Sequence, residues 1–296
     1  MAFSFYTSTA AANGNPATSQ ANFVPEVFSK LLQAKFYSAS VLPAISNTDY
    51  EGEIAGQGDK VQVRTVPTVT INDYQGTVTN QNLESEKVTL NIDKAKYYSF
   101  KVDDVLAAQA DINMLEEASN DAAEQMRIAV ETDVLGNVGA SAGTTHDVGS
   151  LASGNILENI LDMSQTLDEK NIPEEGRFIV LNPAQVSLLK QSELRQAYLT
   201  GDATSPLRNG QVGTVDRFTV YQSNMLATVD ISAENEDADN RTSVLAGHSK
   251  GITFASQFTN TETVRLTDTF GDAVRGLKVY GYKVINPDCL VQGRWK

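Results

Sequence analysis

The sequence is poor in the residues on which disulfide cross-linking, metal binding and acid–base catalysis depend. It has one cysteine, Cys289, and two histidines, His146 and His248, in 296 residues. A single cysteine excludes an internal disulfide, which fits a reducing compartment. The histidines and acids also lack the spacing of a zinc site. We therefore expect no metal and no cofactor.

Positive charge and long apolar runs are scarce as well. The formal net charge is −14 at pH 7, and an acidic surface repels phosphate, so tight binding to DNA or RNA is not expected. No apolar run approaches the roughly 20 residues that a helix needs to cross a bilayer, so we expect no membrane partner. The first ten residues carry no base and do not resemble a secretory signal, so we also expect that no leader precedes Met1.

One short stretch, Gly247–Gly251 (GHSKG), has the G-x-S-x-G pattern of a serine-hydrolase nucleophile elbow. In that fold the histidine base follows the serine, but both histidines of this chain precede Ser249. The next residues, ITFASQF, favour a strand over the helix that an elbow requires. We interpret the stretch as a turn between two strands. Because no nucleophile lies beside an activating base, we expect no enzyme and no catalytic residue.

The first 25 residues contain no charge but several aromatic side chains. Such a segment cannot form its own core, so it is either a disordered tail or an arm that docks on another surface, and its aromatic residues favour the arm. The following stretch, Pro25–Ser40, is predicted to be an amphipathic helix with Pro25 in its first turn.

Two alternating segments, residues 61–65 and 88–92, predict half-buried strands of a long hairpin with a polar tip from about Asn72 to Glu86. A lone two-stranded hairpin is barely stable in water. The hairpin therefore either joins a larger sheet or projects and lies on a neighbouring subunit.

The main helical segment follows, with Asp103 or Asp104 as its cap and Gly136 and Gly139 as its end. Its predicted apolar face is formed by Leu115, Ala118, Ala122, Met126 and Ala129. Four acids near its start could indicate metal or acid chemistry, but a solvated face at the positive end of the helix dipole explains them better. These acids are Glu116, Glu117, Asp121 and Glu124.

Residues 139–251 predict a mixed region of helices and strands. A flexible loop is expected at residues 139–154, and an amphipathic helix after it with Ile156, Ile160, Leu161, Ser164 and Leu167 directed inward. A buried strand over Phe178–Leu181 leads to a short helix capped by Asn182 and started by Pro183. An alternating strand and a turn are expected within residues 213–226, and residues 230–240, with five acids and no base, predict an exposed loop.

The last residues alternate along long strands, around Val264–Leu266 and Leu277–Gly281, with Pro287 close to the final strand. The arm and the hairpin are extensions without a core of their own, which indicates a protein completed by its neighbours.

In this order, the elements resemble the major capsid proteins of tailed bacteriophages, which have the Hong Kong 97-like fold. The stretches GRFIVLNPAQVSLL and VGTVDRFTVYQSNML resemble part of that family's A-domain, and DTFGDAVRGLKVYGYKVINPDCL resembles the closing strands of its peripheral domain. The resemblance implies an α+β fold in four parts. These are an N-terminal arm (1–25), an extended E-loop (50–98), a peripheral domain with a long spine helix (26–49, 99–138 and 252–296) and an axial A-domain (139–251).

The resemblance also implies a function and a set of partners. Copies are expected to form hexamers and pentamers of an icosahedral head shell that encloses double-stranded DNA. The shell would be assembled in the host bacterial cytoplasm and would become part of the virion. The short arm implies a separate scaffolding protein, together with a portal protein and a decoration (cement) protein. Some members form lysine–asparagine crosslinks between subunits, and Lys87 lies near the hairpin tip, but a solvated or ion-paired lysine is the preferred interpretation. An encapsulin-type nanocompartment shell is the alternative function.

Overall fold

The computed structural model describes residues 37–38, 40–49, 60–64, 67, 69–74, 76, 80–82, 87–103, 114–192, 213–231, 240–267 and 270–296. The predicted arm at residues 1–25 and most of the acidic loop lie outside these residues. Of the helix predicted over Pro25–Ser40, only residues 37, 38 and 40 are described, and they are not helical.

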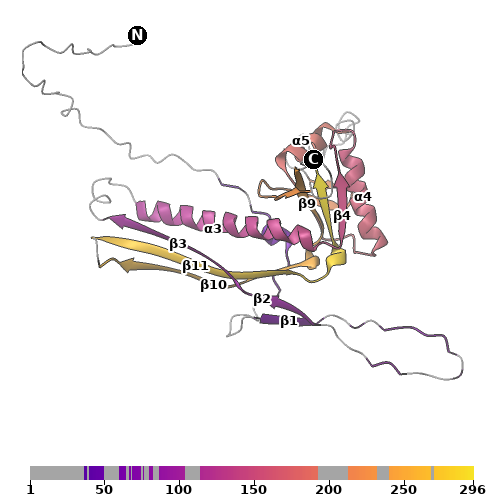
Figure 1. Cartoon of the computed structure of the whole chain (residues 1–296), viewed down its shortest axis with the longest axis horizontal. Helices are drawn as coiled ribbons and strands as arrows, with labels where there is room; N and C mark the ends of the chain where they lie inside the picture. The colour runs from indigo at the N-terminus through magenta and orange to yellow at the C-terminus, as the bar shows by residue number, and fades with distance from the viewer. Residues whose placement is uncertain are drawn as a thin grey trace, which may run out of the picture.

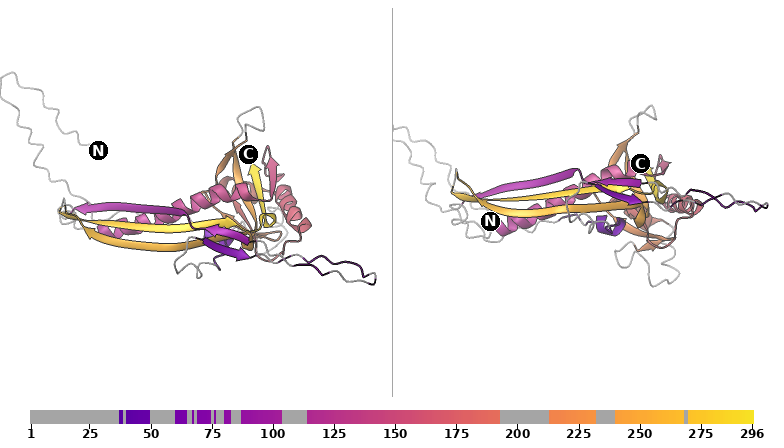
Figure 2. Two further views of the ribbon diagram at one scale, coloured as in Figure 1. Left: turned by 60° about the horizontal axis from the view of Figure 1, so that its bottom comes forward. Right: turned by 90° about the horizontal axis from the view of Figure 1, so that it is seen from below.

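The described chain consists of an elongated layer, a compact mixed sheet at one end of it, and a hairpin that projects beyond the body (Figure 1). The elongated layer is a long helix laid along a narrow sheet, and both views in Figure 2 show this pairing over most of the length of the sheet. The projecting hairpin leaves from the end of the layer that carries the compact sheet.

The narrow sheet has three antiparallel strands in the order β10-β11-β3. Their bounds are Ile252–Arg265 for β10, Gly271–Val284 for β11 and Lys94–Asp103 for β3. The register between β11 and β3 is continuous from Gly271 opposite Asp103 to Tyr280 opposite Lys94. The long strands predicted near the C-terminus are confirmed as β10 and β11.

The long helix, α3, spans Met114–Val138 and ends in a short 3₁₀ turn, η3 (Gly139–Ser141). Its core-facing residues belong to its last turns and pack against the short helix α1 (Leu42–Ile45). These buried residues are Val130, Val134, Leu135 and Val138. The predicted apolar face leads into this row, but its members Ala118, Ala122, Met126 and Ala129 are only half-buried.

The predicted ends of this helix are tested only in part. Asp103 is the last residue of β3 and residues 104–113 lie outside the described residues, so the cap at Asp103 or Asp104 stays a prediction. At the other end Gly139 directly follows Val138, the last residue of α3, as predicted, whereas Gly136 lies inside the helix. A glycine costs a helix only about 1 kcal/mol, and burial of the apolar residues on both sides of Gly136 outweighs that cost.

The compact sheet has seven strands, in the order β4-β12-β9-β5-β7-β6 with β8 paired to β9. The bounds are Thr144–Val148 for β4, Arg177–Leu181 for β5, Thr214–Val215 for β6, Phe218–Gln222 for β7, Thr228–Asp230 for β8, Asn240–His248 for β9 and Leu290–Trp295 for β12. Helices α4 (Ile156–Glu169) and α5 (Pro183–Gln191) contribute to its second core cluster. The short turns η4 (Ser249–Gly251) and η5 (Pro287–Cys289) connect strands at the junction with the narrow sheet.

Two segments of this sheet differ from the sequence-based prediction. Residues 144–148, expected within a flexible loop, form β4 and pair in parallel with β12. The C-terminal strand β12, expected among the peripheral residues 252–296, pairs with β4 and β9 in the seven-stranded sheet instead. Neither segment forms a strand by itself; each is defined by a partner far away in sequence.

The helices of this region confirm most of the predicted local features. Asn182 caps α5, because its Oδ1 accepts a hydrogen bond from the Ala184 N–H at 3.1 Å and its own N–H donates to Gln185 Oε1 at 2.9 Å. In α4 the inward face is as predicted, with one exception. Leu161 is 46% exposed, and Met163 is fully buried in its place.

The root of the hairpin is the predicted pair of strands, β1 (Lys60–Arg64) and β2 (Lys87–Asn91). Leu90 is fully buried and packs with Ala255 and Val279 of the narrow sheet. Gly281 allows this contact, because a Cβ at that position would lie 2.1 Å from the carbonyl oxygen of Asn91. The predicted E-loop range, residues 50–98, extends beyond the end of β2 at Asn91 and includes the first residues of β3.

Candidate assembly surfaces

The projecting hairpin carries large apolar side chains that are mostly exposed among the residues the structure describes. Val69, Ile71 and Tyr74 are 57%, 89% and 75% exposed. The two sides of the hairpin are joined by hydrogen bonds between Thr70 and Gln81, with the backbone N–H of Thr70 donating at 3.2 Å and the Gln81 amide donating at 3.4 Å. An exposed group of large apolar residues on a thin extension marks an interaction surface.

A second open surface lies on the narrow sheet, opposite α3. Lys94 and Tyr280 point toward α3, since both contact Asp133 of that helix. Alternation along the strands therefore places Tyr97 and Leu277 on the opposite face, where they are 79% and 38% exposed. We call this the open sheet face.

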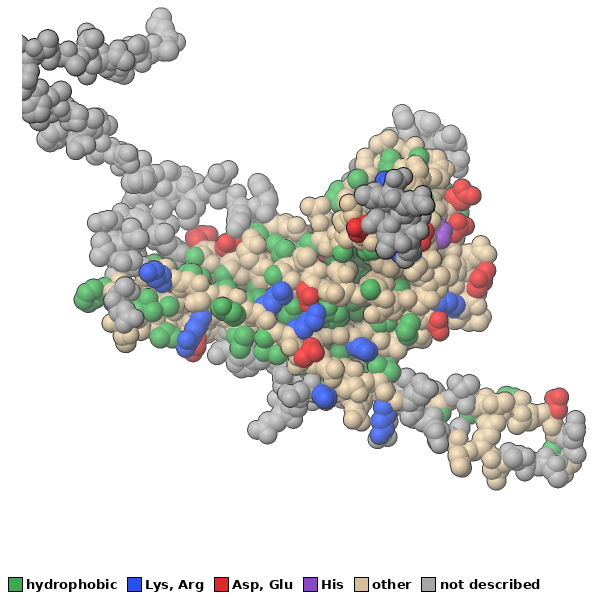
Figure 3. Space-filling view, viewed as in Figure 1, with side chains coloured by type: hydrophobic (Ala, Val, Ile, Leu, Met, Phe, Trp, Pro, Cys, Tyr) green, Lys and Arg blue, Asp and Glu red, His purple; other side chains and the backbone are tan. Residues whose placement is uncertain are grey.

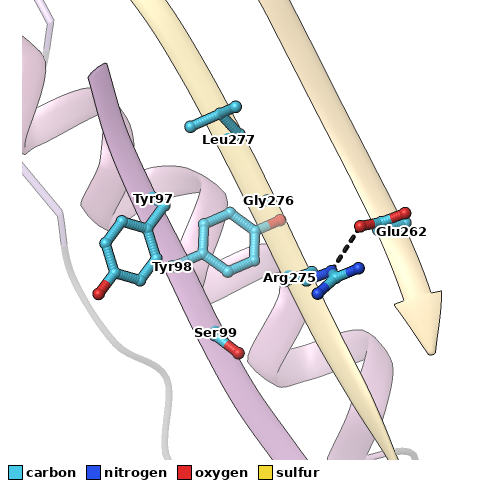
Figure 4. A pocket seen from close by; sticks show the side chains of 7 residues that line it. All are labelled: Tyr97, Tyr98, Ser99, Glu262, Arg275, Gly276 and Leu277. Atoms are coloured by element: carbon cyan, nitrogen blue, oxygen red, sulfur yellow. Dashed lines mark hydrogen bonds and ion pairs between the residues drawn. The ribbon is translucent and has the colours of Figure 1, made fainter. Parts of the chain in front are cut away.

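The open sheet face includes a shallow cavity of about 400 Å³. Figure 4 shows its side chains, with the Arg275–Glu262 ion pair joining β11 to β10 at one side. On the helix side of the same strands the Tyr98 ring lies over Gly276, where a Cβ would come within 2.4 Å of ring carbons. Lysine and arginine side chains on the side seen in Figure 3 lie mostly over the elongated layer and the hairpin root. The open sheet face thus combines exposed apolar side chains with the Arg275–Glu262 ion pair.

A polar cluster holds α3 to the narrow sheet. Lys94 Nζ donates to the Asp133 carboxylate at 2.8 Å and to the Tyr282 hydroxyl at 2.6 Å, and the Tyr280 hydroxyl donates to the same carboxylate at 2.9 Å. Burial opposes ionisation of Asp133, but the hydrogen bonds from Lys94 and Tyr280 outweigh it and hold the pKa of this carboxyl below its usual range. Burial, and then the bond to Asp133, raises the pKa of Tyr280.

The cluster is a feature that sequence analysis missed. Lys94 and Asp133 are 39 residues apart in the chain, and Tyr280 is 147 residues from Asp133. No local sequence pattern predicts that these residues meet. The sequence signal that could have pointed to the cluster is Asp133, an acid on the side of α3 that faces the sheet.

A buried charge secures the turn between α4 and β5. The fully buried Arg177 donates to Asp168 Oδ1 at 2.7 Å and to the backbone oxygens of Ile172 and Pro173. The hydrogen bond from Arg177, with the nearby Arg217, holds the pKa of the Asp168 carboxyl below its usual range. This arrangement makes the α4–β5 turn a rigid corner of the compact sheet.

The GHSKG stretch is a turn between two strands, as predicted. His248 ends β9, Ser249–Gly251 form η4, and β10 begins at Ile252. Its glycines have a packing role. A Cβ on Gly247 would lie 2.3 Å from the carbonyl oxygen of Cys289, and one on Gly251 would lie 3.0 Å from the Cys289 Cβ.

The two histidines and the cysteine, which are the potential catalytic groups, have other contacts or are buried. His248 Nδ1 accepts a hydrogen bond from the Lys250 N–H at 3.1 Å, and burial lowers the pKa of this imidazole. His146 lies on β4, with its Nε2 3.6 Å from Asp162 of α4. Burial raises the pKa of the Cys289 thiol, so the thiolate is disfavoured there.

The remaining candidate residues are on the surface or at its edge. Glu116 and Glu117 are exposed, while Glu124 pairs with Arg127 and Asp121 accepts a hydrogen bond from Tyr37 at 2.8 Å. Within the described ranges, no three His, Cys, Asp or Glu side chains are grouped closely enough to hold a metal ion. Lys87 is exposed at the start of β2. That this lysine is solvated rather than crosslinked to a neighbouring subunit stays a prediction. In the same part of the chain no helix is long and apolar enough to span a membrane.

Comparison with known proteins identifies the family. The profile of the phage capsid protein family matches residues 85–293, which is well over half of the chain. No curated protein sequence matches. Because the family matched is that of phage capsid proteins, the encapsulin alternative gains no support from it.

Solved structures agree. A structure described as "Mycobacterium phage Che8" is 27% identical, with a TM-score of 0.79 over 92% of this chain and 97% of that one. The capsid of cyanophage P-SCSP1u is 16% identical, with a TM-score of 0.75 over 93% and 94%. The capsid of Myoviridae phage XM1 is 14% identical, with a TM-score of 0.65 over 94% and 98%. The chain therefore belongs to the phage capsid protein family and is a tailed-phage major capsid protein with the Hong Kong 97-like α+β fold.

Proposed function

We propose that copies of this chain assemble as hexamers and pentamers of a closed icosahedral shell, and that the shell encloses the double-stranded DNA of a tailed bacteriophage. The observation that carries the proposal is the hairpin, whose described apolar side chains Val69, Ile71 and Tyr74 are largely exposed within one subunit. A lone hairpin is marginally stable in water, and an exposed apolar group on it marks a site that another surface covers. A neighbouring copy supplies that cover.

The parts of the fold take the roles that the family resemblance implies. Residues 1–25 are the N-terminal arm and residues 50–98 the E-loop, and both overlap neighbours. Residues 26–49, 99–138 and 252–296 form the peripheral domain with α3 as its spine, and residues 139–251 form the axial domain at the capsomer centre. The position of β12 in the compact sheet argues for moving residues 290–295 to the axial domain.

Many weak contacts suffice for such a shell. Each subunit meets several neighbours at once, so association is multivalent and the stability of the shell accumulates. The net charge of −14 suits a container that must release its DNA, because an acidic lining does not hold phosphate. The role is structural, and no catalytic residue is assigned.

The proposal includes partners and a place of assembly. A separate scaffolding protein guides closure in the host bacterial cytoplasm, a portal protein occupies one vertex, and a decoration protein binds outside. The acidic residues 230–240 are one candidate contact for the decoration protein. The finished shell is part of the virion.

The test is electron microscopy of the full chain co-expressed with the proteins encoded beside it, with mass spectrometry of what co-purifies. We expect closed shells that contain scaffold or portal components. Shells filled with a single enzyme would contradict the phage role, and a monomer under all conditions would contradict assembly itself.

A paired variant tests the observation directly. Ile71→Asp places a charge in the exposed apolar group and is expected to leave the subunit folded but unable to form shells. Asn82→Asp is the matched control, because it adds the same charge at another exposed position of the hairpin and removes no apolar group. Equal shell yields from both variants would show that the hairpin surface does not carry assembly.

A further inference from the structure

The α3 helix contains a buried carboxylate whose two oxygens are both directed at a segment 90 residues earlier in the chain. Glu131 is 1% exposed. Its Oε1 accepts a hydrogen bond from the backbone N–H of Val41 at 2.9 Å, and its Oε2 accepts one from the Ser40 hydroxyl. Among the described residues no lysine or arginine forms an ion pair with it.

We call residues 40–47 the strap, and its two ends are held in different ways. At the far end, Ile45 is fully buried, and Asn47 exchanges backbone hydrogen bonds with β10, donating to the Ile252 oxygen at 2.8 Å and accepting from the Phe254 N–H at 3.0 Å. At the near end, the hydrogen bonds that tie residues 40 and 41 to the rest of the body are those to Glu131. The far end is therefore secured by packing and sheet pairing, and the near end by burial of Val41 in the core and by the hydrogen bonds to one carboxylate.

The space beside the near end is incompletely filled. An open cavity of about 280 Å³ lies between the strap, α3 and β10, and Ser40, Glu131 and Phe254 are among its lining residues. Arg127 and Lys278 also line this cavity, but the hydrogen bonds that Glu131 accepts from described residues come from Ser40 and Val41. A buried carboxylate has to be satisfied by hydrogen bonds or by a cation, and here the strap provides the hydrogen bonds.

We infer that Glu131 is a positioning residue that fastens the root of the N-terminal segment to α3. Residues 37–40 lead into this fastening, and Tyr37 is itself tied to α3 by a hydrogen bond to Asp121 at 2.8 Å. Glu131 and Asp121 together therefore hold the described start of the chain along α3. This inference rests on the proposed function, in which the N-terminal arm overlaps a neighbouring subunit.

The first test is hydrogen exchange, measured by mass spectrometry on the unassembled full chain. Glu131→Gln removes the charge and leaves one acceptor oxygen, so peptides that cover residues 40–47 should exchange about tenfold faster. Ser40→Ala should give a smaller increase in the same peptides. Glu117→Gln, which removes an exposed charge from the same helix, should leave them unchanged.

The second test is shell formation by the same variants. Glu131→Gln should lower the yield of closed shells and raise that of irregular particles, while the melting temperature stays close to that of Glu117→Gln. Strap exchange equal to that of Glu117→Gln would overturn the fastening role. Faster strap exchange with normal shells would overturn its part in assembly.

The two proposals can fail separately. If the unaltered chain forms no shells, the proposed function fails, while exchange in the unassembled chain still decides whether Glu131 fastens the strap. If shells form but strap exchange does not respond to Glu131→Gln, the proposed function stands and the inference fails.

Discussion

The contact between α3 and the narrow sheet is predicted to depend on one carboxylate, Asp133. Replacement by asparagine, Asp133→Asn, keeps the size of the side chain but removes its charge. The Tyr280 hydroxyl and Lys94 Nζ then lose their charged acceptor. Because Tyr280 is 1% exposed, its hydroxyl has no access to water as a replacement.

The magnitude follows from these contacts. A hydrogen bond to a charged group contributes about 1.5–3 kcal/mol, whereas the Lys94 ion pair contributes less, because that side chain is 38% exposed. We expect the free energy of unfolding to fall by about 2–3 kcal/mol, which corresponds to a decrease of roughly 3–5 °C in melting temperature for a chain of this size.

The assay is urea unfolding of the unassembled subunit, followed by the fluorescence of Trp295, the single tryptophan, which is buried. Asp162→Asn is the control, because Asp162 is 52% exposed and 3.6 Å from His146, and we expect a loss under about 0.5 kcal/mol. A double-mutant cycle with Tyr280→Phe should give a coupling energy of about 1–2 kcal/mol. If Asp133→Asn costs no more than the control, the cluster does not hold α3 to the sheet.

Three further predictions concern the compact sheet. Gly247→Ala places a Cβ 2.3 Å from the Cys289 carbonyl oxygen and should yield little soluble protein, whereas Gly154→Ala, with open space around it, should express normally; equal yields would contradict the packing role of Gly247. The Cys289 thiol, whose pKa is raised by burial, should react with a thiol reagent at pH 7 only after unfolding in urea, and rapid labelling of the native chain would refute this. Arg177 lowers the pKa of Asp168, so the stability that this pair contributes is present above the unfolded pKa of about 3.9 and is lost as pH falls through the lower, folded value. Urea unfolding between pH 7 and pH 3 should show that loss, with a shallower slope in Asp168→Asn; parallel slopes would exclude the pair as its source.

Local patterns predicted those elements whose physical cause is itself local. The hairpin strands were found because burial of one face requires alternation, and the register pairs Val63 with Val88 and Val61 with Leu90. The cap at Asn182 was found because its side chain satisfies a backbone N–H only two residues away. The turn at Ser249 was recognised because the flanking residues favour strands on both sides.

The errors have a common cause in distant partners. Leu161 fits the apolar face that the sequence of α4 predicts. In the structure the buried face of α4 includes Met163 and excludes Leu161, which lies at its edge. Residues 144–148 are polar and follow glycines, and they become a strand only because β12 lies beside them.

The sequence by itself determined the absence of an internal disulfide, the acidic net charge, the local helices and strands, and the order of elements that resembles a phage capsid protein. Those properties depend on composition and on residues within a few positions of each other. The tertiary structure alone decided which sheet receives the C-terminal strand, how Lys94, Asp133 and Tyr280 meet between α3 and the sheet, and that Glu131 fastens the strap. These contacts join residues 39 to 147 positions apart, and only the folded chain brings such residues within hydrogen-bonding distance.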